Sequence, residues 1–416
     1  MVMYRISRRH LLQFAGSTLA TLGLSQLNIQ RKAESYGKVL AQSTPRKLAL
    51  LVGINQYPLQ PLRGCVNDME LQRHLLIHRF GFNPKDIYTL TDEKATRKGI
   101  LEAFEEHLIK QAKPGDVVVY HYSGHGSRVF DPNPIVVEPG SNGGLNGTFV
   151  PVNYGSIDDL PQQGGVVEDI MGHTLFLLML ALKSENFTAV LDSCYSGGAT
   201  RDVRFRARDN QGKKLEISST EKSYQEQWLS RLNLSREDFV KRYRTGVAKG
   251  VVLAATNPEQ TAIDLSWDGF YVGTFTYLLT QYLWQQTSTP EKAIAYAVEN
   301  VPKDFNQTPL YEVKLNSGYE RQPIYLSNPT SPAADAVVTS VKGNQVTLWL
   351  GGVNPAVIKA VEKGTVFTII GAKGGSSGRV TLQSRDSSNR LIGIATVEGV
   401  VREGTLLKAE GLSTGI

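Results

Sequence analysis

The sequence predicts an α/β protein with an open, mostly parallel sheet that carries helices on both faces, followed by a small all-β domain. Three observations lead to this prediction. Continuous apolar runs alternate with helical patterns as far as Leu191, which is typical of parallel strands buried on both faces. Beyond residue 332 apolar residues recur at every second position, as they do in short antiparallel strands. The length of 416 residues leaves room for two or three domains.

Residues 45–326 are expected to form the α/β domain. Apolar runs predict strands at residues 48–54, 87–90, 117–122, 188–191, 250–255 and, as the last strand, 323–326. Helical spacing predicts helices at residues 68–80, 96–112 and 169–183, after Gly273 and after Pro290. One stretch, 199–246, interrupts the pattern with twelve Lys and Arg and seven Asp and Glu residues. We expect it to be a mobile insert that buries little apolar surface.

Residues 333–416 are expected to form a small β-barrel or sandwich. A Pro- and Ser-containing linker, 328–332, separates them from the α/β domain. Alternating apolar residues predict strands at 345–350, 365–370, 379–382 and 391–397, with turn-rich segments between them.

The first 41 residues differ in composition from the rest of the chain. Arg8 and Arg9 precede a weakly apolar stretch, Leu11–Leu27, and small residues at 39–41 offer a cleavage site. This leader resembles a twin-arginine export signal, so we expect an exported, periplasmic or equivalent location. The alternative is a frayed basic N-terminus on a cytoplasmic protein. The stretch contains too many Gln, Ser, Thr and Gly residues for a stable membrane span.

The net charge of +6 lies almost entirely in this leader. Residues 1–41 hold six Lys and Arg and one Glu, so the rest of the chain has 39 basic and 38 acidic residues. Such a balanced body lacks the basic surface that nucleic-acid binding requires, and we expect no nucleic-acid partner.

Two consecutive predicted strands are followed by residues that suit nucleophilic catalysis. His125 follows the strand at 117–122, and Cys194 follows the strand at 188–191. Functional groups of open parallel sheets gather outside the carboxyl ends of the strands, so we expect the imidazole and the thiol to meet there. A neighbouring imidazole makes a thiol a competent nucleophile at neutral pH. Either residue alone is more often a buried structural side chain, but the pair favours a Cys–His dyad.

Four sequence blocks resemble the metacaspase branch of the caspase-like cysteine peptidases, and in particular its prokaryotic members, the orthocaspases. The blocks are Leu50-Leu-Val-Gly-Ile-Asn55, Leu62-Arg-Gly-Cys-Val-Asn-Asp68, His121-Tyr-Ser-Gly-His-Gly126 and Leu191-Asp-Ser-Cys-Tyr-Ser-Gly197. The resemblance covers about residues 45–326 and implies a caspase-like fold. It also implies that His125 is the general base and acid and that Cys194 is the nucleophile. The backbone N–H groups of Gly126 and Cys194 would hold the oxyanion.

Two carboxylates are expected at the same edge of the sheet. Asp192 lies two residues before Cys194 on an extended segment and shares its face, and Asp68 ends the loop after the first strand. Two carboxylates in a cleft attract a cation and exclude an anion. The resemblance implies that Cys65, Asp68, Ser123 and Asp192 line a pocket for Arg or Lys. The alternatives are that Asp68 caps a helix and that Asp192 is structural.

No cofactor or metal is expected. Calcium-dependent metacaspases use an Asp cluster, but the position seven after Cys194 is Arg201, and the family's acidic block appears only as Glu168-Asp169. Calcium requires six to eight oxygen ligands, so its binding is disfavoured. Two cysteines, Cys65 and Cys194, cannot build a four-cysteine zinc site.

The expected function is therefore that of a cysteine endopeptidase that cleaves protein or peptide substrates after Arg or Lys. Two alternatives stay open. The first is a catalytically silent scaffold that acts through the β domain. The second is a nucleotide-binding protein, which is disfavoured because neither GxGxxG nor GxxxxGK[ST] follows a predicted strand.

Self-processing is also expected, because the basic insert 199–246 is tethered beside the active site at a high effective concentration. The alternative is an inert, solvated insert. We expect the first basic residues of the insert to lie too near to Cys194 to reach back, so that the cut falls between Lys213 and Lys249. These first residues are Arg201, Arg204, Arg206 and Arg208.

Overall fold

The computed structural model describes residues 45–131, 145–154, 161, 164–194, 204–257, 260–370 and 376–412. The expected export signal at 1–41 lies outside these residues. The chain divides into two units, Met1–Arg46 and Lys47–Ile416, and the helices and strands of the described residues lie in the second. None of the helices in the described residues is long and apolar enough to cross a membrane.

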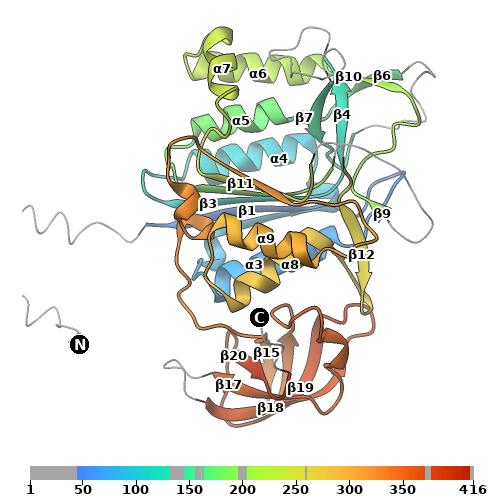
Figure 1. The fold of residues 1–416 in the computed structure, drawn as a ribbon, viewed down its shortest axis with the longest axis vertical. Coiled ribbons are helices and arrows are strands. Elements are labelled where there is room, and N and C mark those ends of the chain that lie inside the picture. The colour runs from blue at the N-terminus through green and yellow to red at the C-terminus, as the bar shows by residue number, and fades with distance from the viewer. Residues whose placement is uncertain are drawn as a thin grey trace, which may run out of the picture. The chain divides into compact units, whose positions relative to one another are not determined.

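A six-stranded sheet in the order β14-β11-β8-β3-β1-β2 forms the centre of the α/β region (Figure 1). Its strands are β1 (Lys47–Gly53), β2 (Ile87–Thr91), β3 (Val117–Ser123), β8 (Phe187–Asp192), β11 (Val251–Ala254) and β14 (Leu310–Val313). All neighbours are parallel except β14, which pairs with β11 in the antiparallel sense. The predicted open, mostly parallel sheet is therefore confirmed.

The strand predicted at 323–326 is wrong. Residues Ile324–Leu326 form a 3-10 turn, and β14 is the edge strand instead. Tyr325 and Leu326 have φ values of 62° and 49°, which lie in the left-handed region and are incompatible with a strand. The apolar run is explained by burial, because the Tyr325 ring is fully buried and its hydroxyl donates to the Gln72 side chain at 2.7 Å.

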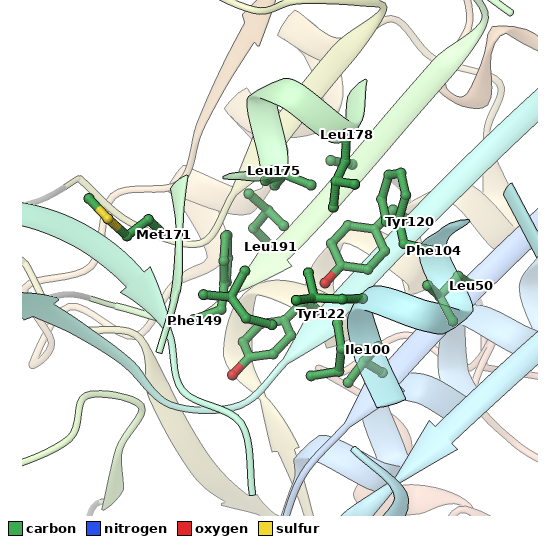
Figure 2. Close-up of a cluster of buried hydrophobic side chains, with 14 of the residues drawn as sticks. Leu50, Ile100, Phe104, Tyr120, Tyr122, Phe149, Met171, Leu175, Leu178 and Leu191 are labelled. Carbon is green, nitrogen blue, oxygen red and sulfur yellow. The ribbon is translucent and has the colours of Figure 1, made fainter. Parts of the chain in front are cut away.

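Helices cover both faces of the central sheet (Figure 1). One face carries α3 (Cys65–His78), α8 (Thr274–Gln285) and α9 (Pro290–Asn300), and the other carries α4 (Arg97–Ala103), η3 (Phe104–Ile109) and α5 (Gly172–Ala181). Each face has its own buried apolar cluster. Figure 2 shows part of one cluster, in which Tyr120 and Tyr122 of β3 lie near Leu175 and Leu178 of α5. Both faces of the sheet are therefore buried, which leaves the ends of the strands as the part of the sheet where a functional site can form.

Two smaller sheets were not foreseen in the sequence, because their strands are short and have no clear alternation. A five-stranded sheet contains β4 (Gly126–Phe130), β5 (Leu145–Phe149), β6 (Gly164–Val167), β7 (Ile170–Met171) and β10 (Lys214–Ile217). A three-stranded sheet contains β9 (Arg204–Phe205), β12 (Ile263–Trp267) and β13 (Phe270–Gly273). Both sheets contain strands that touch the candidate site, as described below.

The expectation of an insert that buries little apolar surface is wrong for its described part. The insert forms β9, β10, α6 (Ser219–Arg231) and α7 (Arg236–Tyr243). Trp228, Leu229 and Phe239 are buried in the core cluster that also holds α5. The basic composition hid this, because a few large apolar side chains on one helix face suffice to anchor an otherwise charged helix.

Six strands close into a barrel near the C-terminus, which decides between the predicted barrel and sandwich. They are β15 (Ala336–Lys342), β16 (Gln345–Trp349), β17 (Val366–Ile370), β18 (Ser376–Arg385), β19 (Ile392–Glu398) and β20 (Leu406–Ala409). The barrel order is β15-β16-β19-β18-β17-β20, with antiparallel neighbours. Closure leaves no free strand edge.

Candidate active site

His125 and Cys194 lie at neighbouring strand ends, as the sequence predicts. Strands β3 and β8 pair in parallel, with Ser123 opposite Asp192 at the carboxyl end, and each of the two residues follows two positions later. The loops also touch, because a Cβ at Gly126 would lie 2.3 Å from the carbonyl oxygen of Cys194. Only glycine permits this approach, which brings the imidazole-bearing loop against the thiol-bearing one.

The His125 ring is oriented by its backbone and its neighbours. Its Nε2 lies 2.7 Å from the carbonyl oxygen of Gln60, and a carbonyl only accepts, so Nε2 carries the proton. Nδ1 then holds the lone pair, and no hydrogen-bond partner for it occurs in the described part of the chain. The His125 N–H donates to the Tyr57 hydroxyl at 2.9 Å, and the two rings lie 4.4 Å apart. The lone pair of Nδ1 is therefore available to accept a proton.

Burial favours the neutral forms of both groups. The Cys194 thiol lies 3.8 Å from the Ala262 carbonyl oxygen, and desolvation raises its pKa to about 12. Desolvation lowers the pKa of His125 to about 4. Near neutral pH this state therefore holds a neutral thiol and a neutral imidazole.

A segment of the chain itself lies across this site. The carbonyl oxygen of Arg206 accepts hydrogen bonds from the N–H of Gly126 at 2.8 Å and from the N–H of Cys194 at 3.2 Å. These are the two N–H groups that the family resemblance implies for the oxyanion. The Arg206 N–H donates to the Ala262 carbonyl at 3.0 Å, and β9 pairs with β12 just before it. The segment therefore runs through the site in the extended form of a bound peptide.

The side chain of Arg206 fills a fully buried acidic pocket. Its guanidinium nitrogens lie 2.6 Å from a carboxylate oxygen of Asp68, 3.1 Å from one of Asp192 and 3.0 Å from one of Asp264. It also donates to the Ser123 hydroxyl at 2.6 Å. Arg206 is 0% exposed, as are both Asp68 and Asp192. A cation is what such a pocket needs, because a buried carboxylate without a partner costs several kcal/mol.

The carboxylates of this pocket are held by surrounding backbone and hydroxyl groups. Asp68 accepts from the Gly273 N–H at 2.8 Å, and Asp192 accepts from the N–H and the hydroxyl of Thr276 at 3.0 and 2.6 Å. Burial raises the pKa of Asp68 to about 7, although Arg206 acts against this shift. The residue before α3 is Gly64, so Asp68 is not the helix cap. Asp192 has a structural role through its hydrogen bonds from Thr276, and it also contacts the guanidinium of Arg206.

Cys65 completes the set of predicted pocket residues. It begins α3 and is fully buried, and burial raises the pKa of its thiol, against an opposing effect of the Arg206 charge. No disulfide joins Cys65 and Cys194. The structure thus gathers Cys65, Asp68, Ser123 and Asp192 around one arginine.

Three participants escaped the sequence prediction. Asp264 lies on β12, a strand too short to be recognised, and it also accepts from the backbone N–H groups of Arg63 and Gly64. Gln60 meets the imidazole through its backbone carbonyl, and its side-chain oxygen accepts from the Asp209 N–H at 2.9 Å. Arg206 was noted, but as one basic residue among many. No pattern in the sequence distinguishes it from its neighbours.

Among the described residues, no group of three His, Cys, Asp or Glu side chains is arranged to hold a metal ion. Asp169, part of the acidic block considered for calcium, has both carboxylate oxygens within 2.8 Å of Arg208, and one of them also accepts from Thr148. These oxygens are therefore engaged by the protein in this state.

Acid is expected to destabilise the uncut chain, because several histidines are buried in their neutral form. Desolvation lowers the pKa of His78, His125 and His173 to about 4 and that of His121 to about 3. A lowered pKa adds stability above the unfolded value of ~6.5, and this stability is lost as the pH falls towards 4. The raised pKa of Asp68 acts in the opposite direction, but as one group against four.

We therefore expect the free energy of unfolding of the Cys194→Ala chain to be lower at pH 5 than at pH 7.5, by on the order of a few kcal/mol. Denaturant unfolding at the two pH values measures this difference. The Cys194→Ala background excludes the self-cleavage expected from the sequence during the measurement. Equal or greater stability at pH 5 would contradict the neutral burial of these histidines.

The site now has the layout of a cysteine peptidase on an α/β fold. A buried thiol and a buried imidazole lie at neighbouring strand ends, beside an acidic pocket. Residues 47–202 match the family model described as "Metacaspase, peptidase C14 domain". This part of the chain is therefore similar to the metacaspase peptidase domain, as the sequence blocks predict.

Curated relatives support the same family. The chain is 36% identical over 167 residues to Metacaspase-1 of Meyerozyma guilliermondii, which covers 38% of this chain and 37% of that protein. It is 34% identical over 185 residues to Metacaspase-1B of Aspergillus clavatus, covering 41% and 42%. The chain thus spans less than half the length of these relatives. Among solved structures, protein GSU0716 from Geobacter sulfurreducens aligns with a TM-score of 0.46 and 20% identity, covering 68% of this chain and 100% of that one.

Proposed function

We propose that the protein is a cysteine endopeptidase that cleaves peptide bonds after Arg or Lys, with Cys194 as nucleophile and His125 as general base and acid. One observation carries the proposal. The side chain of Arg206 is buried among three carboxylates while its carbonyl oxygen accepts from the N–H groups of Gly126 and Cys194. This is the arrangement that a substrate residue before the cleaved bond must adopt.

The proposed chemistry follows from the atoms in place. Nδ1 of His125 takes the proton of the Cys194 thiol, and the thiolate sulfur attacks the carbonyl carbon of the residue in the acidic pocket. The oxyanion that forms is held by the N–H groups of Gly126 and Cys194. The protonated imidazole then gives its proton to the leaving amine, which breaks the peptide bond and leaves a thioester. Water, deprotonated by the same imidazole, hydrolyses the thioester and restores the thiol.

The pocket supports a preference for a basic residue before the cut. Three carboxylates in a buried site attract a cation and repel the carboxylate of an Asp substrate. The guanidinium of Arg spreads its donors over Asp68, Asp192 and Asp264, which a single ammonium cannot do equally well. We therefore propose Arg over Lys, and both far above Asp.

A panel of fluorogenic peptides that differ only in the residue before the cut tests this specificity. Wild type is expected to cleave after Arg and Lys but not after Asp. Asp192→Asn should lose on the order of 2–5 kcal/mol in kcat/KM for the Arg peptide, because the bound cation loses a charged partner. Glu70→Gln, a charge loss on α3 away from the pocket, is the matched control and should leave the rate unchanged. Equal cleavage after Asp and Arg would contradict the assignment of the pocket.

We also propose that the first substrate is the chain itself, cut between Arg206 and Ala207. The expectation that residues 201–208 are too near to Cys194 is wrong, since Arg206 does occupy the pocket. Eleven residues lie between Cys194 and Arg206, and an extended chain of that length spans up to ~40 Å, enough to turn back. The expected cut between Lys213 and Lys249 is less favourable, because much of that stretch lies in β10, α6 and α7. A peptide bond inside regular structure must first unfold to enter a site.

A catalytically silent scaffold is the competing proposal. The same peptide panel separates the two, because a silent scaffold cleaves none of the peptides. We propose that activity is independent of calcium, supported by the engagement of Asp169 with Arg208 and Thr148. An unchanged rate in the presence of a calcium chelator is the expected result.

A further inference from the structure

A second buried ion pair lies on the other side of the Arg206–Ala207 bond. Both carboxylate oxygens of Asp169 accept from the guanidinium of Arg208, at 2.7 and 2.8 Å, in a two-pronged arrangement. Arg208 is 4% exposed and Asp169 is 2% exposed. An ion pair on a surface loop would be exposed to water, whereas the Asp169–Arg208 pair is buried.

The surroundings of this ion pair form a built pocket. The Thr148 hydroxyl donates to Asp169 at 2.6 Å, which fixes the carboxylate, and the Ser127 hydroxyl accepts from Arg208 at 3.0 Å. The Tyr154 ring lies 5.5 Å from the guanidinium carbon and forms a cation–π contact. The polar groups come from β4, from β5 and from the residue before β7, all strands of the five-stranded sheet.

The backbone holds Arg208 in a fixed position relative to the cut. The N–H of Gly126 donates to the Arg206 carbonyl at 2.8 Å, and the N–H of Arg208 donates to the Gly126 carbonyl at 2.9 Å. Gly126 thus bonds to both sides of the bond to be cut, and Ala207 pairs with it in parallel. The pocket around Asp169 therefore receives the second residue after the cut, whatever peptide occupies the site.

We propose that Asp169, Thr148, Ser127 and Tyr154 form a specificity pocket for a basic residue, preferably Arg, at the second position after the cleaved bond. This inference rests on the proposed function. The preferred substrates would then be protein segments that carry two basic residues separated by one residue, with the cut after the first. The buried carboxylate gives the reason, because it loses its partner when an uncharged side chain takes the place of Arg208.

Four quenched-fluorescent peptides test the proposal with the self-processed wild type. They share Arg before the cut and Ala after it and differ only in the next residue, which is Arg, Lys, norleucine or Glu. The kcat/KM for Arg should exceed that for norleucine by about tenfold or more, with Glu lowest, since hydrogen bonds to a buried charge are strong. Competition from the chain's own Arg208 lowers all four rates alike, so their ratio reports selectivity.

Two variants locate the effect. Asp169→Asn should reduce the Arg-to-norleucine ratio to near one. Glu168→Gln, the same loss of charge at the next position, should keep the wild-type ratio, because that side chain contacts Arg97 and Ser218 instead.

Equal rates for the four peptides in wild type would overturn the proposal and leave the pair as a purely structural contact of the uncut chain. This result would not affect the proposed function, because the peptides would still be cleaved after Arg. Failure of wild type to cleave any of the four would overturn the proposed function and this inference together.

Discussion

Cys194→Ala and His125→Ala are each expected to lower the rate of Arg-peptide cleavage by more than about 1,000-fold while the protein stays folded. The alanine side chain cannot form the proposed thioester, and loss of the imidazole removes Nδ1, the proposed acceptor of the thiol proton. Initial rates with an Arg-coumarin peptide, beside circular dichroism of each variant, measure both effects. Residual turnover of Cys194→Ala within tenfold of wild type would remove the thiol from the mechanism.

Cys65→Ala is the matched control for the loss of a buried thiol. Cys65 lies in the acidic pocket rather than at the oxyanion groups, so its replacement should leave substantial activity. A loss as large as that of Cys194→Ala would mean that the two thiols have been assigned the wrong roles.

Arg206→Ala is expected to abolish the cut at 206–207 and to destabilise the uncut chain. It removes the residue that fills the pocket and leaves Asp68, Asp192 and Asp264 buried without their cation. Breaking a buried charge network by removing one partner costs on the order of 3–5 kcal/mol. Denaturant unfolding in the Cys194→Ala background measures the stability, and gel analysis of the single variant measures the cut.

Two further variants separate the charge of Arg206 from its position. Arg206→Lys keeps the cation and loses the planar fork, so the cut should persist at a lower rate. Arg204→Ala removes an arginine whose side chain donates to the Pro61 carbonyl and not to a carboxylate of the pocket as described, and it should be cut like wild type. Undiminished cutting of Arg206→Ala at the same bond would contradict the role of the pocket.

The sheet and the location of His125 and Cys194 at one edge of it could be predicted because their signals are local and strong. Continuous apolar runs identified β1, β3 and β8, and the parallel order then placed His125 and Cys194 at one edge. Where burial rather than strand pairing explains an apolar run, as at Ile324–Leu326, the prediction failed. An apolar run indicates that residues are buried more reliably than it indicates which secondary structure they form.

The contents of the pocket could not be predicted, because they depend on a long-range approach. Arg206 meets Asp264 only after β9 pairs with β12, and both strands are too short to leave an alternating pattern. Asp169 and Arg208 are likewise 39 residues apart in sequence. The sequence of a charged stretch does not show whether a basic residue in it is exposed to solvent or buried against a carboxylate.

Sequencing the new N-termini of purified wild type after incubation, beside Cys194→Ala treated in the same way, tests the central claim most directly. In that proposal, Arg206 occupies the site as the chain's own substrate, and its carbonyl oxygen lies at the N–H groups of Gly126 and Cys194. We expect a new N-terminus at Ala207 in wild type and an uncut Cys194→Ala chain. An active wild type whose 206–207 bond stays intact, or whose cuts all fall elsewhere, would contradict the claim.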